Sequence, residues 1–312
     1  MLVAITGGNG FVGQLLVKKH LLLGDRVRIL SRCETSFFNE AHIVVGDLTK
    51  AGDHLKYFVE GVDVLYHCAG EINDESKMYD LHVLGTSRLL AVAKENIGRW
   101  VQLSSVGVYG PPLGLANSER VVTENTIIRP NGVYEVTKAE SDKLVEEACQ
   151  DSSMSYSIVR PSNIFGSHMP NQSLRSLGAM IKKKQFFYIG KRGSIATYIH
   201  VDDVVEVLLR CGLDKRAEGE TFNISNDCLF EEMINGMAFA LGVKQPFIRT
   251  PEPWVRVGVG ISEKFISVPL TKSRVDALVS RTRYSCAKLE NKLGFIPQVH
   301  VPSAMGEFLL EQ

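Results

Sequence analysis

The chain has 312 residues, which is enough to bury a large core but short for two full domains. One dominant domain with an appended lobe is therefore expected. Lys+Arg and Asp+Glu both number 35, so the net charge is zero and gives no sign of a nucleic acid or an anionic membrane as partner. Any basic site must be local.

The six cysteines are widely scattered, with no CxxC pair and no nearby histidine cluster. This spacing argues against a disulfide framework and against a zinc site, so no metal is expected. No stretch approaches the roughly 20 apolar residues of a membrane span, and the first residues lack the features of a secretory signal. A cytoplasmic protein that acts on a small molecule is the resulting expectation.

Short apolar runs alternate with amphipathic segments of helical length through the first half, a pattern typical of βαβ units. The predicted buried parallel strands are 2–6, 26–31, 43–46, 62–68, 100–104 and 155–159. The predicted helices between them are 11–23, 75–95 and 133–149. Residues 1–165 are thus predicted to form an α/β domain with a doubly wound parallel sheet of the Rossmann type.

The second half is richer in loops and is predicted to form mainly a small C-terminal α/β substrate-binding lobe, over residues 166–312. Within it, a helix that opens at Asp202-Asp203 and a strand at 221–224 are expected to return to the Rossmann domain, over 201–225. Further helices are expected near 230–241 and 285–293. The apolar segment 251–269, with Trp254, Phe265 and Ile266, suits a lid, a subunit contact or a pocket wall, although simple packing is the favoured interpretation.

A glycine-rich turn follows the first predicted strand and opens the first predicted helix, which is the context of a dinucleotide-binding turn. Gly7 would make the tight turn, Gly10 would let the backbone approach a pyrophosphate, and Gly13 would allow close helix packing. Backbone N–H groups at the helix start would face the phosphates. The cofactor-binding residues predicted here are Gly7, Asn9, Gly10, Phe11, Val12 and Gly13.

The ends of the next strands extend this predicted cofactor site. Arg32 stands where an NAD site would carry an acidic residue, so NADP is favoured over NAD, through a charge-assisted contact with the 2'-phosphate. Asp47 and Leu48 end the third strand, where the adenine would lie, although Asp47 suits a turn cap equally well. The fourth strand is followed by small residues that would leave room for the cofactor, Cys68, Ala69 and Gly70.

Tyr134 and Lys138 lie four residues apart, on one face of a predicted helix. A free tyrosine titrates at about 10, and both a lysine charge and an oxidised nicotinamide would favour its phenolate, as acid/base catalysis requires. Lys138 would also hold the nicotinamide ribose. Ser105 follows the fifth strand, at the carboxyl edge of the sheet, where it would hydrogen-bond the substrate oxygen.

Over nearly its whole length the chain resembles the extended short-chain dehydrogenase/reductase family, the NAD(P)-dependent epimerase and dehydratase group. The segments that carry the resemblance are 6–13, 47–48, 84–86, 104–110, 134–138, 160–166 and 198–203. It implies that Tyr134 is the general acid/base, that Lys138 orients it and that Ser105 steadies the reacting oxygen. It also implies a homodimer through helices 75–95 and 133–149, and further cofactor contacts from Pro161, Ser162 and Asn163, with Asn163 also reaching the substrate.

The chain departs from the family pattern at three places. Ser105 is followed by Val-Gly rather than Asp-Glu, so a 4,6-dehydratase is not expected. His82 replaces an asparagine that many members carry, which would change local hydrogen bonds, although a packed core histidine is the simpler interpretation. Ala196-Thr197 stands where sugar-nucleotide members tend to carry a diphosphate-binding arginine. Other cations are candidates for that contact, namely Lys191, Arg192 and above all Arg274.

These residues favour an NAD(P)-dependent oxidoreductase that acts on a secondary alcohol or ketone. A nucleotide sugar is the favoured substrate, with the enzyme an epimerase or a 4-ketoreductase. The tail from 269 to 295 resembles equally the sterol and 3β-hydroxysteroid dehydrogenase branch, which is the alternative. A non-catalytic NADP-sensing regulator is a third hypothesis, and the intact set of Ser105, Tyr134 and Lys138 speaks against it.

Overall fold

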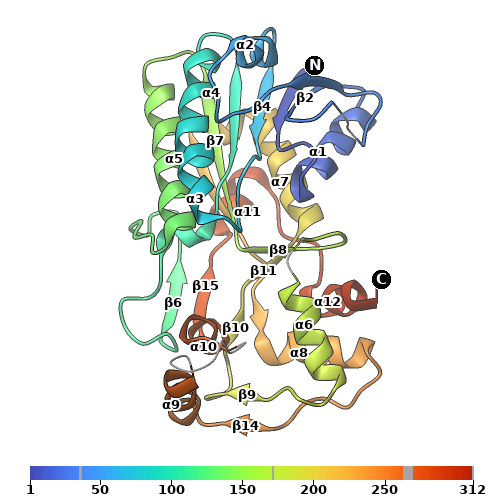
Figure 1. Ribbon diagram of the computed structural model, residues 1–312, viewed down its shortest axis with the longest axis vertical. Coiled ribbons are helices and arrows are strands. Elements are labelled where there is room, and N and C mark those ends of the chain that lie inside the picture. Colours follow the sequence, from blue (N-terminus) through green and yellow to red (C-terminus); the bar gives the residue numbers. More distant parts are fainter. Residues whose placement is uncertain (35–36, 171, 263–269, 311–312) are drawn as a thin grey trace.

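Seven parallel strands form the central sheet of the computed structural model, which describes residues 1–34, 37–170, 172–262 and 270–310 (Figure 1). Their order across the sheet is β12-β7-β5-β4-β1-β2-β3. This is the strand order of a Rossmann fold, in which the chain winds outward from β1 on both sides. The predicted doubly wound sheet is therefore confirmed. The strands are β1 Leu2–Thr6, β2 Arg26–Ser31, β3 His42–Val45, β4 Val64–His67, β5 Arg99–Leu103, β7 Ser155–Pro161 and β12 Glu220–Ile224.

The sheet is buried on both faces because its strands are nearly continuous apolar runs. Along β1, Val3 and Ile5 point into a core shared with two helices, α1 (Phe11–Leu22) and α7 (Val201–Leu213). Ala4, between them, points to the opposite face. That second face is covered by α2 Asp53–Val59, α4 Thr86–Ala93 and α5 Val133–Gln150.

The predicted helix over 75–95 is interrupted, which corrects the expectation of one regular helix. It consists of α3 (Glu75–Met78), a π-helical segment (Tyr79–Gly85) and α4. A π-helical turn holds one more residue than an α-helical turn, so it rotates the residues within it relative to the helix that follows. The apolar periodicity of the sequence does not register such an insertion. Because of this π-helical segment, His82 points inward, as described below.

Beyond β7 the chain builds a lobe of short elements below the sheet (Figure 1). Four pairs of short strands join it: β6 Glu119–Val122 with β15 Arg281–Tyr284, β8 Asn163–Phe165 with β11 Tyr198–His200, β9 Tyr188–Ile189 with β14 Arg249–Thr250, and β10 Ile195–Ala196 with β13 Cys228–Leu229. Its helices are α6 Ser173–Lys182, α8 Phe230–Ala240, α9 Glu252–Ser262, α10 Lys272–Val279 and α12 Val301–Leu310. Helix α11 (Ala287–Leu293) packs instead on the sheet domain, where Leu289 and Leu293 join the core of α1 and α7.

The lobe has an apolar core of its own, in which Met233 and Met237 of α8 pack against Met305 of α12. Residues 201–225 form α7 and β12, and β12 pairs with β7 at the edge of the sheet. The domain boundary expected near residue 165 stays a prediction. Among the described helices, none is long and apolar enough to cross a membrane.

The described part of segment 251–269 is helix α9, whose Val255 and Val259 pack against Val275 and Val279 of α10. This packing is the interpretation that the sequence favoured. On the opposite side of the helix, Trp254 is exposed. Phe265 and Ile266, the other residues singled out there, lie outside the described residues.

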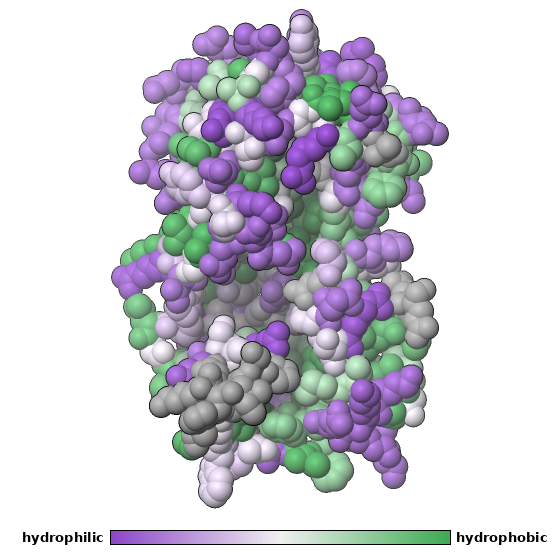
Figure 2. Space-filling model, in the orientation of Figure 1, coloured by the Kyte–Doolittle hydropathy of each residue, from purple (hydrophilic) through white to green (hydrophobic). Residues whose placement is uncertain are grey.

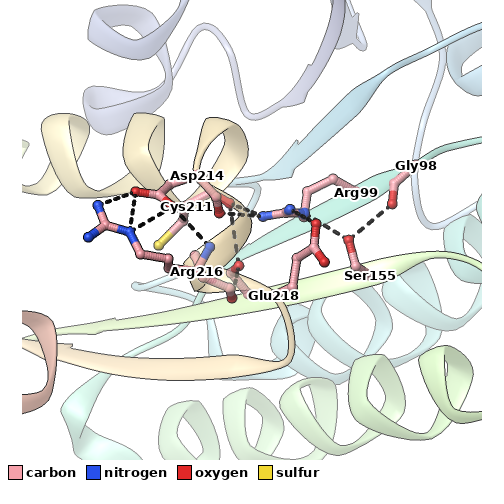
Figure 3. Close-up of polar contacts among 9 residues, drawn as sticks. Gly98, Arg99, Ser155, Cys211, Asp214, Arg216 and Glu218 are labelled. Atoms are coloured by element: carbon pink, nitrogen blue, oxygen red, sulfur yellow. Dashed lines mark hydrogen bonds and ion pairs between the residues drawn. The ribbon is translucent and has the colours of Figure 1, made fainter. Parts of the chain in front are cut away.

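Arg99, the first residue of β5, ties the sheet to the end of α7 (Figure 3). Its Nε donates to Ser155 Oγ at 2.8 Å, and one terminal nitrogen donates to the carbonyl oxygens of Cys211 and Asp214, at 2.7 and 3.3 Å. The other terminal nitrogen pairs with Glu218 at 2.5 Å. Because the last carbonyls of a helix have no partner within it, one buried guanidinium satisfies the end of α7 and fixes it against two strands.

Candidate active site

The carboxyl ends of β1, β4, β5 and β7 open into a cavity of about 950 Å³. Loops that follow these strands form its upper wall, and the lobe closes it from below. The structure brings most of the predicted site residues to this cavity. Those that line it are Gly7, Gly10, Phe11, Val12, Gly13, Cys68, Ala69, Gly70, Ser105, Tyr134, Lys138, Pro161, Ser162 and Asn163.

Five predicted residues do not line the cavity. Asn9 and Arg32 lie beside the end of β2, with the Asn9 amide donating to Ser31 Oγ at 3.2 Å and with Arg32 exposed. Asp47 caps a turn, because its carboxylate accepts from the backbone N–H and the hydroxyl of Thr49, and Leu48, next to it, is buried. Arg274 is exposed on α10. Their contacts with a cofactor or substrate stay predictions.

The glycine turn has the geometry that its sequence predicts. Gly7 has a φ of +68°, and a Cβ there would lie 2.9 Å from the Cys68 carbonyl group. A Cβ on Gly13 would lie 2.1 Å from Gly7 O, so only glycine lets α1 approach the turn this closely. Helix α1 begins after Gly10 with no side-chain cap and no acidic residue in its first turn. Its first N–H groups are therefore open to an anion such as a pyrophosphate.

Tyr134, Lys138 and Ser105 all line the cavity. Helix α5 presents Tyr134 and Lys138 one turn apart, and the buried Lys138 ammonium donates to Leu103 O, at the end of β5, at 2.6 Å. Ser105 accepts from the backbone N–H of Gly107 at 3.1 Å, which orients its hydroxyl, and it hydrogen-bonds the phenol of Tyr134. The three side chains thus come from two elements that the sheet brings together.

The expectation that Lys138 lowers the pKa of Tyr134 is wrong. Burial raises the pKa of Tyr134 to about 12, and the charges of Glu135 and Asp142 act in the same direction. The hydrogen bond with Ser105 lowers this pKa but does not reverse the shift. Lys138 is itself buried, which lowers its own pKa, and its ammonium points to a backbone carbonyl.

Two buried histidines connect the cofactor side of the cavity to helix α5. Glu71 N donates to His82 Nε2 at 2.8 Å, so the neutral ring carries its proton on Nδ1 and donates to Thr137 Oγ1, also at 2.8 Å. Thr137 in turn hydrogen-bonds the carbonyl oxygen of Tyr134 at 3.0 Å, and the His82 ring meets the Tyr134 ring edge-on. Burial and the Lys138 charge lower the pKa of His82 to about 4. His82 is more than a packed core histidine, because its two hydrogen bonds join the loop after β4 to helix α5.

His67, at the end of β4, continues this network toward the glycine turn. Thr6 Oγ1 accepts from Ala69 N and donates to His67 Nδ1 at 2.8 Å. On the other side, His67 Nε2 donates to Thr86 Oγ1 at 2.9 Å, and that hydroxyl donates to His82 O. Burial is the main reason why the pKa of His67 falls to about 3, so both rings stay neutral at pH 7.

A buried ion pair supports the other side of α5. Asp142, one turn beyond Lys138, pairs with Arg160 of β7 at 3.0 Å and accepts from Ser104 Oγ at 2.7 Å. Arg160 also donates to the hydroxyl of Tyr109 at 3.0 Å. The sequence pattern alone did not indicate these contacts of Asp142, nor those of Thr137. An acidic side chain one turn beyond Lys138, on the buried face of a helix, is the signal that would have indicated Asp142.

Residues 3–225 match the model of the NAD dependent epimerase/dehydratase family. The match spans the central sheet, the glycine turn and helix α5. The chain therefore belongs to this family. It is an NAD(P)-dependent oxidoreductase or epimerase, and the hypothesis of a non-catalytic regulator is set aside. Among the described residues, no cluster of His, Cys, Asp or Glu is suited to hold a metal ion.

Among curated proteins, the chain is 26% identical to 3β-hydroxysteroid dehydrogenase/decarboxylase isoform 1 of Arabidopsis thaliana, over 95% of this chain and 76% of the relative. It is 24% identical to the decarboxylating sterol-4α-carboxylate 3-dehydrogenase of Homo sapiens, over 96% and 85%. A similar solved structure is UDP-glucose 4-epimerase with UDP-glucose from Thermotoga maritima, at a TM-score of 0.76, with 17% identity over 100% and 98% of the two chains.

A second similar structure is a short-chain dehydrogenase/reductase superfamily protein from Agrobacterium tumefaciens with bound NAD. Its TM-score is 0.76, with 20% identity over 100% of this chain and 97% of that chain. At this level of identity the likeness of the solved structures supports the fold. It leaves the substrate of this chain to be argued from the cavity.

Proposed function

We propose that the enzyme transfers hydride reversibly between NAD(P) and a secondary alcohol or ketone, with Tyr134 as the proton donor and acceptor. The residues present fit the cofactor, because the open start of α1 suits its pyrophosphate and Lys138, which lines the same cavity, would hold the nicotinamide ribose. A nicotinamide held there would supply or accept the hydride. Ser105 would hydrogen-bond the reacting oxygen, and the Tyr134 hydroxyl would deliver a proton to that oxygen or remove one from it.

The substrate side of the cavity carries mainly apolar and uncharged groups. Ile72, Met169 and Leu174 contribute apolar surface, and Asn163 and Thr197 contribute hydrogen-bonding groups. Among the described residues that line this cavity, Lys138 is the only lysine or arginine. A diphosphate normally needs cationic partners held in place, so this lining favours an uncharged substrate.

A smaller cavity of about 300 Å³ shares Gly107, Glu135, Thr197 and Tyr284 with the first, so the two cavities are adjacent. Gly107 and Gly132 make room for the Glu135 side chain, since a Cβ on either would lie within 2.8 Å of it. Arg120 also lines this cavity, but its guanidinium is bonded to the carbonyl oxygens of Tyr109 and Gly110. The carboxylate of Glu135 would therefore repel a diphosphate and accept a substrate hydroxyl.

These two features support an alcohol or ketone on a largely apolar skeleton, in the manner of a sterol or 3β-hydroxysteroid dehydrogenase. The observation that carries the proposal is the acidic, cation-poor wall around Glu135. The names of the two curated relatives agree with it. A nucleotide sugar, which the sequence favoured, is the second candidate. It is supported by the hydrogen-bonding groups of Asn163 and Thr197, which suit sugar hydroxyls.

A panel of ligands with NAD or NADP present separates the two candidates. We expect 3β-hydroxysterols to raise the melting temperature and to reduce the cofactor, whereas UDP-, dTDP- and GDP-sugars leave both unchanged. Glu135→Gln is expected to raise KM for the alcohol with little change in kcat, and Glu140→Gln, at an exposed position of the same helix, serves as its control. Turnover of a nucleotide sugar with no response to sterols would overturn the proposed substrate class.

Retention of the cofactor separates a net dehydrogenase from an epimerase. An epimerase returns its cofactor to the starting state in every cycle and has no need to release it. We therefore expect the purified enzyme to exchange added NAD(P) readily and to need it in each turnover. Stoichiometric cofactor that survives gel filtration, together with turnover in its absence from the buffer, would instead favour an epimerase.

NADP is the cofactor that we propose for this site, because Arg32 is exposed beside Asn9 and Ser31 at the end of β2. A charge-assisted contact to the 2'-phosphate would require such a cation. Arg32→Ala is expected to raise KM for NADP by roughly tenfold or more while KM for NAD stays the same. Arg26→Ala, exposed at the other end of β2, is the control. An equal effect of Arg32→Ala on both cofactors would contradict the preference.

A further inference from the structure

A basic and aromatic surface lies at the end of the lobe furthest from the sheet, where α6 runs into β9 and the chain after α8 returns as β14 (Figure 1). The two segments that form it, 178–190 and 241–250, contain four lysines and one arginine but no Asp or Glu. The zero net charge of the whole chain therefore hides a local excess of positive charge. We call this surface the lobe tip.

The lysines of the lobe tip are Lys182, Lys183, Lys184 and Lys244, and all four are exposed. Within the described part of the chain, none of them forms an ion pair, whereas Arg249, the one arginine here, pairs with Glu231 at 2.8 Å. Lys184 has a φ of 57°, a backbone conformation that is uncommon for residues other than glycine. Four unpaired charges of one sign attract an anionic partner.

Large apolar side chains stand among these lysines. Phe247 is 88% exposed and Ile248 54% exposed, and Phe187 is exposed at 36%. Tyr188 N donates to Ile248 O at 2.9 Å, so the chain segments of Phe187 and Ile248 lie side by side. Lys182 and Leu241 line the same small hollow, which places α6 next to the start of the second segment. In Figure 2, hydrophobic and strongly hydrophilic side chains are neighbours at this lower end.

We propose that the lobe tip docks on an anionic lipid bilayer. Lysines interleaved with exposed aromatic and aliphatic side chains are suited to the membrane interface, where the ammonium groups meet lipid phosphates and the apolar groups enter the acyl boundary. An acidic protein surface would pair with the lysines, but it would give the exposed Phe247 and Ile248 no apolar environment to enter. The docked enzyme lies on the bilayer and does not span it. The inference is independent of the proposed substrate.

Co-sedimentation of the full chain with vesicles tests the proposal. We expect binding to phosphatidylcholine vesicles that contain phosphatidylglycerol, little binding to phosphatidylcholine alone, and loss of binding at high salt. Replacing Lys182, Lys183 and Lys184 together by Gln should lower the affinity on the order of 100-fold. The control replaces Lys18 and Lys19 of α1 and Lys94, which directly follows α4; all three are exposed on the sheet domain, and the net charge changes equally.

The apolar side chains need a separate test, because charge alone would also give salt-dependent binding. Phe247→Ser should weaken vesicle binding, whereas Leu22→Ser, at a position of α1 that is 75% exposed, should not. In a Trp254→Phe background, Phe247→Trp places a fluorophore in the lobe tip, and its emission should shift to the blue when anionic vesicles are added. No binding by the wild-type chain, equal binding by the two triple variants, or self-association through the lobe tip would overturn the proposal.

Discussion

The protonation of Tyr134 is controlled by its immediate neighbours. Burial raises the pKa of the phenol to about 12, and Glu135 and Asp142 add to the shift. A phenol that stays protonated at neutral pH is ready to donate its proton to an alkoxide that forms when a ketone is reduced. Removal of a proton from an alcohol would require an added positive charge nearby, and an oxidised nicotinamide carries one.

Tyr134→Phe is expected to lower turnover by about 100-fold or more, because it removes the group that transfers the proton. The measurement is steady-state oxidation of the reduced cofactor with the best ketone from the ligand panel. Cofactor binding, followed by fluorescence, should change little. Tyr57→Phe, at an exposed position of α2, is the control. Full activity of Tyr134→Phe would exclude the tyrosine as the proton donor.

At the scale of single residues, spacing along the chain indicated Ser105, Tyr134 and Lys138, because each follows a strand or shares a helical face. It did not indicate Thr137 or Glu135, which lie beside them. Thr137 acts through a hydrogen bond to His82, which is 55 positions away. Glu135 acts through the space that glycines leave around it. Neither property is visible in a helical pattern.

Among the elements, the join between β5 and α7 shows how a parallel sheet holds its covering helices. Arg99 is 7% exposed and reaches the last carbonyl oxygens of α7 from the start of a central strand. Arg216 lies just beyond the end of α7 and pairs with Asp214 at 2.6 Å, but this pair is at the surface (Figure 3). The two arginines thus form similar ion pairs at different degrees of burial, and the loss of the buried pair lowers the free energy of unfolding more.

Arg99→Met is expected to lower the free energy of unfolding by about 2–4 kcal/mol, because it removes the buried hydrogen bonds of the guanidinium to Ser155, Cys211 and Asp214. Arg216→Met should leave the free energy of unfolding almost unchanged, since water replaces the lost contact. Urea unfolding followed by circular dichroism measures both. If the two variants were equally stable, the guanidinium of Arg99 would not be holding α7 to the sheet.

The whole molecule places its chemistry between the sheet domain and the lobe, and it keeps two histidines neutral beneath the cavity. The pKa of His67 is lowered to about 3 and that of His82 to about 4, in each case mainly by burial. The unfolded chain takes up protons on both rings near pH 6.5, whereas the folded chain does not. Stability must therefore fall as the pH drops from 6.5 toward 4.

The homodimer through the helices of residues 75–95 and 133–149 stays a prediction.

Between pH 7 and pH 5, each of these histidines is expected to remove about 2 kcal/mol from the free energy of unfolding. His82→Asn cannot take up this proton, so its stability should fall correspondingly less over the same interval. Calorimetry or urea unfolding at both pH values measures the difference. A pH dependence of the variant identical to that of the wild-type chain would mean that His82 is protonated in the folded state.

The sequence by itself determined the doubly wound parallel sheet and the glycine turn, because both depend on local patterns: apolar runs of strand length that alternate with helical segments, and glycines at fixed spacing. It also placed a tyrosine and a lysine one helical turn apart. It also indicated the family. Only the tertiary structure decided that His82 turns inward, through a π-helical segment that no periodicity reveals. The charge of the substrate cavity was likewise decided by folding, since Glu135 and Arg120 meet there from distant elements. Folding also builds the lobe tip, because it brings two lysine-bearing segments side by side whose charge the zero net charge of the whole chain hides.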